Sequence, residues 1–321
     1  MLELKNSLDR EIETNRIALA ELSKAITNKV VFAFVGGGCS NKLHYPTWPE
    51  LIKKIESEVK GRHAVDLQLY KNSDRCTKDY LWYAEILKGY LIEQEFYELM
   101  DKEFKPKANM DSLYHQKLIT IPFRNYITTN YDVILEHASY RLAVQLEQFC
   151  WRDEDTLKKF FQELNDANSP RSIFHIHGIY NRSDSIVLTE KDYLGLYFEQ
   201  ELVSKVLWSI VSTFRMCFLG FSMDDLDLLS IFRKSRWDFG RGKPRHFTLF
   251  REDRLEARIS LRVYMRDKYG IDPIFYSKQD GENPYVEEEN LIDELVKINA
   301  VSPVQKTADG LSEMTRINLS G

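Results

Sequence analysis

The chain has 321 residues, of which 43% are hydrophobic and 29% charged, and its 44 basic and 49 acidic residues give a formal net charge of -5. This length allows one large domain or two ordinary ones, and the composition is typical of a soluble globular protein. The acidic balance argues against direct nucleic-acid binding, which usually requires a basic surplus. No apolar run approaches the roughly 20 residues that a membrane-spanning helix needs.

The four cysteines, Cys39, Cys76, Cys150 and Cys217, lie far apart and form no Cys-x-x-Cys pair. This spacing indicates neither a disulfide framework nor a zinc site. The first residues are charged from the start and do not resemble a secretory signal. We therefore expect a cytoplasmic protein that needs no metal.

Residues 1–27 predict an amphipathic N-terminal helix, because apolar residues such as Leu8, Ile12, Leu22 and Ile26 recur at helical spacing among charged ones. We expect this helix to pack on its own domain, with an oligomer contact as the alternative.

Residues 30–35 (VVFAFV) form an uninterrupted apolar run, which is typical of a strand covered on both faces in a parallel sheet. Residues 62–120 are helical in pattern and predict an insertion beside the sheet. A long helix is expected to end near residue 215. The remaining predicted strands cover residues 125–129, 172–178, 185–189, 216–220, 246–250 and 272–276.

Strands that alternate with helices in this way predict a doubly wound parallel α/β sheet over residues 28–300. Residues 301–321 are polar and lack periodicity, which indicates a tail or linker.

Four of the predicted strands end in unusual segments: GGGCS, TTNYD, HIHG and GFSMDD. In a doubly wound fold ligands bind beyond the carboxyl ends of the strands. Because each segment follows an apolar run, we expect all four to meet along one edge of the sheet.

In GGGCS, the glycines Gly36, Gly37 and Gly38 let the backbone turn tightly and approach a pyrophosphate. Ser40 adds a hydroxyl that suits a phosphate or a helix cap. The segment matches neither Gly-x-Gly-x-x-Gly nor a P-loop, and the alternative is a tight turn without a ligand.

In TTNYD, Asn130 follows a strand and carries both a donor and an acceptor, so it suits a ribose hydroxyl or a water. The alternative is an Asn in a turn, with Asp132 capping the next helix.

In HIHG, side-chain alternation predicts that His175 and His177 point to the same face of their strand. His177, at the strand end, suits a general base because histidine titrates near neutrality. A structural histidine and a metal ligand are the alternatives, although no nearby cluster supplies further ligands.

In GFSMDD, Gly220 and Ser222 are predicted to meet the adenosine side of a nucleotide. Asp224 or Asp225 either caps the next helix or accepts hydrogen bonds from ribose hydroxyls.

The order of these four motifs resembles the sirtuin family over about residues 28–280. The matching positions are Gly36 to Ser40, Thr128, Asn130, Asp132, His177 with Gly178, and Gly220 with Ser222. The resemblance implies a Rossmann-like sheet with a smaller module.

Two departures narrow the resemblance. The cysteine pairs that bind zinc in protein-deacylating sirtuins are missing, and residues 41–51 (NKLHYPTWPEL) replace their Gly-Ile-Pro-Asp-Phe-Arg segment. A Pro-x-Trp segment leading into a helix is similar to the sirtuin-like NAD hydrolases of bacterial antiphage defence. That branch implies an effector that depletes NAD, works as an oligomer and is joined to, or partnered with, a sensor or ATPase; this sequence shows no sensor domain of its own.

The resemblance also implies roles for individual residues. The glycines and Ser40 would hold the pyrophosphate and nearby ribose. Asn130 would contact the nicotinamide ribose and position water, with Asp132 supporting the site, and His177 would be the base. The remaining predicted NAD contacts are Thr128, Gly220, Ser222 and Asp225.

The expected reaction is hydrolysis of NAD to nicotinamide and ADP-ribose, whereas an internal acceptor would give a cyclic product. NAD-dependent protein deacylation and non-catalytic sensing of NAD or ADP-ribose are the alternative functions.

Overall fold

The computed structural model describes residues 2–71, 79–107, 112–166, 168–223, 225–240, 242, 245–279 and 285–300. The predicted tail at 301–321, Cys76 and Asp224 lie outside these residues.

Seven parallel strands form one sheet in the order β3-β4-β2-β1-β5-β6-β7. The strands are β1 (Val31–Val35), β2 (Tyr126–Thr128), β3 (Glu147–Cys150), β4 (Ser172–His175), β5 (Arg215–Leu219), β6 (His246–Arg251) and β7 (Ile271–Tyr276). The sheet grows outward from β1 on one side and from β5 on the other, which confirms the predicted doubly wound, Rossmann-like fold. The direction of winding reverses between β1 and β5, and such a switch point is where these folds bind ligands.

One predicted strand is wrong, and one strand of the sheet was not predicted. Residues 185–189 were expected to form a strand, but Ser183–Ser185 form a 3-10 turn and the buried residues after it lead directly into a helix. A short apolar run does not by itself distinguish a strand from another buried segment. The prediction also missed β3, a sheet-edge strand that begins with Glu147 and Gln148 and pairs only with β4.

The expected long helix before residue 215 is divided into three segments. These are α10 (Glu190–Leu194), a π-helical turn η3 (Gly195–Glu199) and α11 (Glu201–Thr213). A π-helical turn interrupts the regular helix and is often found at functional sites.

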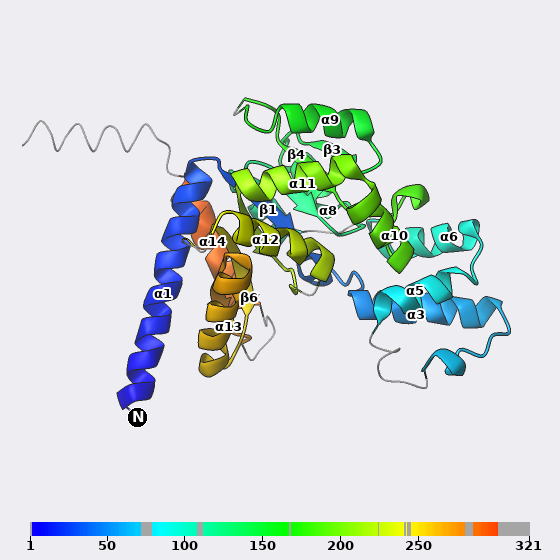
Figure 1. Ribbon diagram of the computed structural model, residues 1–321, viewed down its shortest axis with the longest axis horizontal. Coiled ribbons are helices and arrows are strands. Elements are labelled where there is room, and N and C mark those ends of the chain that lie inside the picture. Colours follow the sequence, from blue (N-terminus) through cyan, green and yellow to red (C-terminus); the bar gives the residue numbers. More distant parts are fainter. Residues whose placement is uncertain are drawn as a thin grey trace, which may run out of the picture.

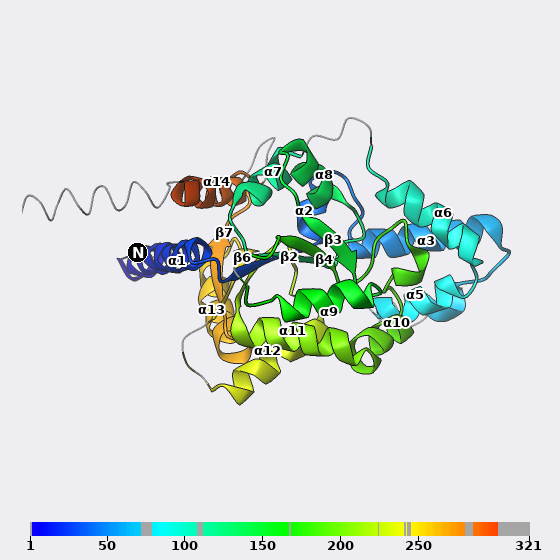
Figure 2. The ribbon, with the colours of Figure 1, turned by 90° about the horizontal axis from the view of Figure 1, so that it is seen from above.

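The two faces of the sheet differ in side-chain size. In β1, Val31, Ala33 and Val35 join the core cluster on one face, whereas Phe32 and Phe34 join the cluster on the other. The first face packs against α1 (Leu2–Thr27), α7 (Leu113–Thr120), α8 (Ile134–Arg141) and α14 (Val286–Ala300), and the second against α9 (Glu154–Gln162), α11, α12 (Leu226–Asp238) and α13 (Leu255–Tyr269). The resulting three layers are visible in Figures 1 and 2.

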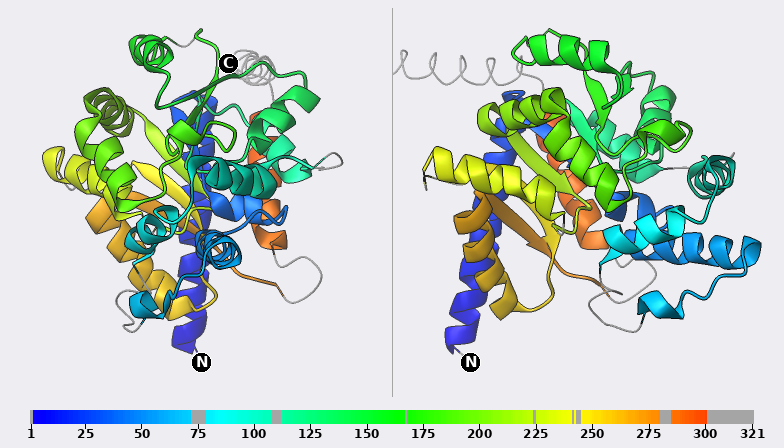
Figure 3. Two further views of the ribbon diagram at one scale, coloured as in Figure 1. Left: turned by 90° about the vertical axis from the view of Figure 1, so that its right-hand side faces the viewer. Right: turned by 45° about the vertical axis from the view of Figure 1, so that its right-hand side comes forward.

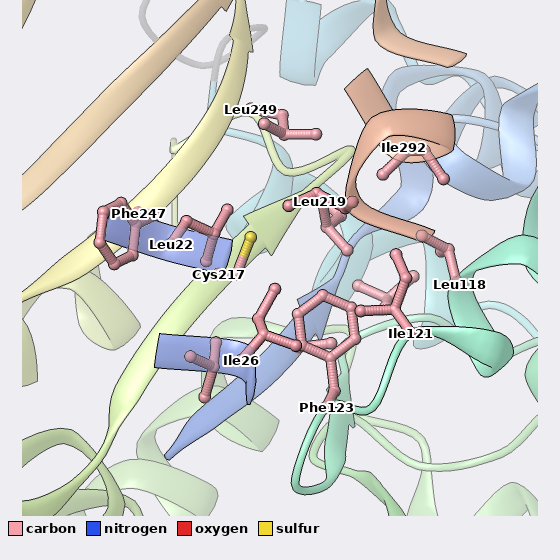
Figure 4. Close-up of a cluster of buried hydrophobic side chains, with 14 of the residues drawn as sticks. Leu22, Ile26, Leu118, Ile121, Phe123, Cys217, Leu219, Phe247, Leu249 and Ile292 are labelled. Carbon is pink, nitrogen blue, oxygen red and sulfur yellow. The ribbon is translucent and has the colours of Figure 1, made fainter. Parts of the chain in front are cut away.

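The N-terminal helix α1 packs on its own sheet. Leu22 and Ile26 are completely buried and lie among side chains of β5, α7 and α14 in the core shown in Figure 4. Burying one such side chain contributes about 1.5–3 kcal/mol to stability.

A helical subdomain follows β1 in the chain. It consists of the helices α3 (Trp48–Arg62), η1 (Gln68–Lys71), α5 (Tyr80–Lys88) and α6 (Glu93–Phe104). Its core includes Tyr131 and Ile179, which follow β2 and β4, so the subdomain packs beside the carboxyl ends of these strands (Figure 3). Helix α7 lies within the predicted insertion of 62–120 but packs on the sheet itself.

A buried guanidinium joins α1 to the far edge of the sheet. Arg262 of α13 donates hydrogen bonds to Glu11 (2.5 Å) and Asn15 (2.7 Å) of α1. The same group donates to Asp272 (2.8 Å) and to the Pro273 carbonyl (2.7 Å) in β7.

We expect Arg262→Ala to lower the free energy of unfolding by about 3–5 kcal/mol, because it leaves the buried carboxylates of Glu11 and Asp272 without this partner. Urea denaturation measures the change. Arg254→Ala is the control, since that side chain is 77% exposed and exposed ion pairs contribute about 0–1 kcal/mol. Equal losses in the two variants would contradict the anchoring role.

Candidate functional site

The four unusual segments lie at the ends of four neighbouring strands. The strands β4, β2, β1 and β5 are consecutive in the sheet, so the loops that follow them lie side by side at its carboxyl edge. The structure therefore brings the predicted site residues to one edge of the sheet, and the switch point lies between two of these loops.

The glycine-rich loop packs directly on the loop after β5. The Gly36 N–H donates to the Leu219 carbonyl (2.9 Å) and the Gly38 N–H to the Gly220 carbonyl (2.8 Å). A Cβ on Gly36 or Gly38 would lie only 2.7 or 2.8 Å from the Gly220 oxygen. Gly220 itself has φ +60°, and a Cβ there would clash with the Cys39 backbone. These three glycines therefore permit close contact between the two loops.

Gly37 is in a different environment from its neighbours. Among the described residues beyond its own helix, one atom lies within 4 Å of a Cβ built on Gly37: Asn130 Oδ1, at 3.9 Å. Among the three consecutive glycines, Gly37 is thus the one that faces the predicted ribose-binding side chain.

We expect Gly220→Ala to lower the free energy of unfolding by about 1–3 kcal/mol more than Gly240→Ala, as typical overpacking does. Both glycines have positive φ, but a Cβ on Gly240 meets nothing within 4 Å. The pair of variants therefore separates the clash with Cys39 from backbone strain. Urea denaturation gives the comparison, and equal losses would show that the loop contact contributes nothing.

Ser40 connects the glycine-rich loop to the residues that follow β2. The Asn130 side-chain amide donates to Ser40 Oγ (2.9 Å), and the Asp132 carboxylate also interacts with Ser40. Asp132 accepts from the N–H of Ile134 (3.1 Å), the first residue of α8, although the N-cap of this helix is Val133. Burial raises the pKa of Asp132, and the bonds from Ser40 and Ile134 partly oppose that shift.

Thr128 has a structural position. It is 1% exposed, donates to the Val35 carbonyl (2.8 Å) and accepts from the Asn130 N–H (3.0 Å). It thereby fixes the turn that presents Asn130, and its contact with NAD stays a prediction.

His177 lies in a closed aromatic pocket. Its Nε2 atom is 3.0 Å from the Tyr197 hydroxyl and 3.7 Å from Asp225 Oδ2, and its Nδ1 atom is 3.5 Å from the Tyr193 hydroxyl. The ring is 3% exposed, and burial lowers the pKa of His177 to about 3. At neutral pH the imidazole in this closed pocket is therefore uncharged.

The two histidines do not share a face, which corrects the prediction from side-chain alternation. β4 ends at His175, so the pleat no longer governs His177. His175 contacts Glu136 of α8, whereas His177 contacts α10 and η3 on the other side of the sheet.

The loop after β5 contributes Asp225 rather than Ser222 to the buried cluster. Asp225 caps α12 by accepting from the Leu228 N–H (2.9 Å), and burial raises the pKa of its carboxyl to about 6. Ser222 is exposed.

Sequence reasoning missed three side chains of this site: Tyr193, Tyr197 and Glu136. The two tyrosines are four residues apart, which indicates one helical face, but only the fold shows that this face covers His177.

We expect His177 to make the protein sensitive to acid. The unfolded state binds a proton below a pKa of about 6.5, whereas the folded site stays neutral down to about 3, so stability falls over this interval as the pH falls. Between pH 7 and pH 5 the wild type should lose about 2 kcal/mol more unfolding free energy than His177→Gln. Denaturation at both pH values measures this difference.

The control for this prediction is the exposed His137, replaced by Gln in the same way. If His177→Gln and His137→Gln show the wild-type pH dependence alike, the neutral state assigned to His177 is wrong.

A separate cavity of about 300 Å³ lies at the opposite edge of the sheet. Its lining includes Arg124, Glu147 and Ser172, which precede or begin strands. It is therefore remote from the carboxyl-edge cluster.

Among the described residues no group of three or more His, Cys, Asp or Glu side chains could hold a metal ion. Cys39, Cys150 and Cys217 are buried free thiols. No helix in the described ranges is long and apolar enough to cross a membrane.

Part of the chain is similar to a known protein family. Residues 124–274 match the family model of the SIR2-like domain. The matched segment contains Asn130, Asp132, His177, Gly220 and Ser222, whereas the glycine-rich loop precedes it.

Several curated proteins are similar over most of the chain. Defense-associated sirtuin 2 of Bacillus subtilis is 25% identical over 219 residues, which cover 65% of this chain and 20% of that protein. The NAD(+) hydrolase ThsA of Enterococcus faecium is 26% identical over 247 residues, 74% of this chain and 46% of the relative. The NAD(+) hydrolase ThsA of Bacillus cereus is 23% identical over 259 residues, which cover 79% of this chain and 51% of that protein. The chain thus spans between a fifth and about half of the length of these relatives.

Proposed function

Because this chain carries a SIR2-like domain, we propose that it hydrolyses NAD at the bond between nicotinamide and ribose and acts as an effector that depletes NAD in antiphage defence. The observation that carries the proposal is the convergence of the glycine loop, Asn130, His177 and the loop after β5 at one sheet edge. The names of the relatives, NAD(+) hydrolase and defence-associated sirtuin, point the same way.

In the proposed reaction water attacks the ribose carbon that carries nicotinamide. The C–N bond breaks with its electron pair moving to the pyridinium ring, so neutral nicotinamide leaves and the positive charge passes to the ribose. ADP-ribose forms when the attacking water loses a proton. His177 is proposed to accept a proton from a ribose hydroxyl or from this water. Burial lowers the pKa of His177 to about 3 in the closed pocket, so this role requires the pocket to open and restore the basicity of the ring.

Asn130 is proposed to orient the nicotinamide ribose and the water. Its amide already bonds to Ser40, so the two side chains form one polar unit beside Gly37. We assign the pyrophosphate to the glycine loop and Ser40, and the adenosine half to Gly220, Ser222 and Asp225.

Substrate access under this proposal requires movement of the aromatic cover. Tyr193 and Tyr197 lie within hydrogen-bonding reach of the two ring nitrogens of His177, and both belong to the segment interrupted by the π-helical turn. We propose that NAD hydrolysis begins when this segment releases His177, under the control of self-association or of a sensor or ATPase partner in the cytoplasm.

We expect Asn130→Ala and His177→Ala each to lower nicotinamide release by at least about 100-fold, as loss of a general base or of substrate positioning does. Purified protein is incubated with NAD, alone and with the proteins encoded beside it, and nicotinamide and ADP-ribose are quantified. Circular dichroism and thermal unfolding establish that each variant is folded.

The exposed residues His137 and Asn165 provide matched controls, since His137→Ala and Asn165→Ala change the same side-chain types outside the cluster. Wild-type release by folded His177→Ala would refute the role assigned to this residue. Tight NAD binding with no release by the wild type, with or without its partners, would favour the sensing function instead.

A further inference from the structure

His175 occupies a buried position directly behind Asn130. It is the last residue of β4 and is 1% exposed. Its Nδ1 atom lies 3.2 Å from the backbone carbonyl of Asn130, and its Nε2 atom lies 2.6 Å from Glu136 Oε1 of α8. The ring therefore bridges the turn after β2 and the following helix.

The two contacts determine where the protons are. A backbone carbonyl only accepts hydrogen bonds, so Nδ1 must carry a hydrogen. A neutral imidazole has a single N–H and would direct the Nε2 lone pair at the Glu136 oxygen. A separation of 2.6 Å between two such acceptors requires a proton between them.

The surroundings of the ring favour a charged pair. The charged groups that act on it are Glu136 from α8 and Asp132 from the turn after β2, and Cys150 is its register partner on the neighbouring strand β3. Burial lowers the pKa of His175, but the attraction of Glu136, its hydrogen bond and the Asn130 carbonyl outweigh burial and raise the pKa overall. Glu136 Oε2 is buried and has no hydrogen-bond partner among the described residues, so His175 supplies the compensation for this carboxylate.

We infer that His175 and Glu136 form a positioning pair, an imidazolium that donates to both the Asn130 carbonyl and the Glu136 carboxylate and so fixes the turn that presents Asn130. This inference rests on the proposed function, in which Asn130 orients the ribose and water. His175 does not touch substrate. It acts on the reaction through the backbone of Asn130.

The first test does not depend on activity. The full chain is labelled with ¹⁵N-histidine, and the His175 signals are assigned by their loss in His175→Gln. At pH 7.5 we expect both ring nitrogens of His175 to show the shifts of a protonated imidazolium, whereas Glu136→Gln should give a neutral ring. A neutral His175 in the wild type would overturn the inference.

The second test uses the pH profile of nicotinamide release. Deprotonation of His175 at alkaline pH removes the bridge to Glu136, so wild-type kcat should fall there. In Glu136→Gln a neutral ring can donate to Asn130 and accept from the new amide. We therefore expect a loss of about threefold at neutral pH, the effect of one weakened hydrogen bond, and no alkaline fall. An unchanged alkaline limb in this variant would contradict the proton bridge.

The third test separates positioning from binding. His175→Ala should lower kcat by about 100-fold, as a misplaced reacting group does, while KM changes less than threefold. Glu147→Gln, at the other end of the neighbouring strand β3, is the control and should leave both constants as in the wild type. A loss confined to KM would overturn the positioning role. If the wild type releases no nicotinamide, alone or with the proteins encoded beside it, the proposed function fails, and the histidine spectra still decide whether the charged pair exists.

Discussion

The site depends on the close approach of two backbone segments at the switch point of the sheet. The glycine loop after β1 and the loop after β5 meet at Gly38 and Gly220, with an N–H to carbonyl distance of 2.8 Å. No side chain fits between them, because a Cβ on Gly36, Gly38 or Gly220 would overlap backbone atoms. The glycines thus bring the loop after β5, and with it Asp225 near His177, into one cluster with the loop that carries Ser40. Without this contact the motifs would be separate turns on one sheet edge.

Burial determines the protonation states of the side chains in the cluster. His177 is uncharged, Asp132 and Asp225 have raised carboxyl pKa values, and His175 lies against a carboxylate. A reaction that develops positive charge on a ribose suits a site with a neutral base and polar groups already oriented, because such groups need little rearrangement as charge develops. The same burial keeps His177 beneath Tyr193 and Tyr197, which agrees with the proposal that NAD hydrolysis begins only when this segment moves.

Most of the fold and the meeting of the four motifs could be predicted from the sequence. Buried parallel strands read as apolar runs, and their carboxyl ends must lie at one edge, which is enough to place Ser40, Asn130 and His177 together. The strand β3 was not predicted because its first two residues are polar and it shows no apolar run. The prediction that His175 and His177 share a face was wrong, because side chains alternate regularly only within a strand and β4 ends at His175. Tyr193, Tyr197 and Glu136 could not be assigned, since their roles come from the packing of helices that the strand pattern does not position.

Helix α14 supports the glycine loop of the site as well as packing in the core. Lys42, which follows α2 (Gly37–Asn41), forms a buried ion pair with Glu288 of α14 at 2.9 Å, and the two side chains are 10% and 2% exposed. The Tyr114 hydroxyl donates to the other Glu288 oxygen at 2.7 Å, and its ring lies 3.6 Å from the Lys42 ammonium. Breaking a buried pair of this kind by loss of one partner costs about 3–5 kcal/mol. Any displacement of α14 must therefore either carry the segment after the glycine loop with it or overcome that energy, so the position of α14 and the geometry of the glycine loop are mechanically linked.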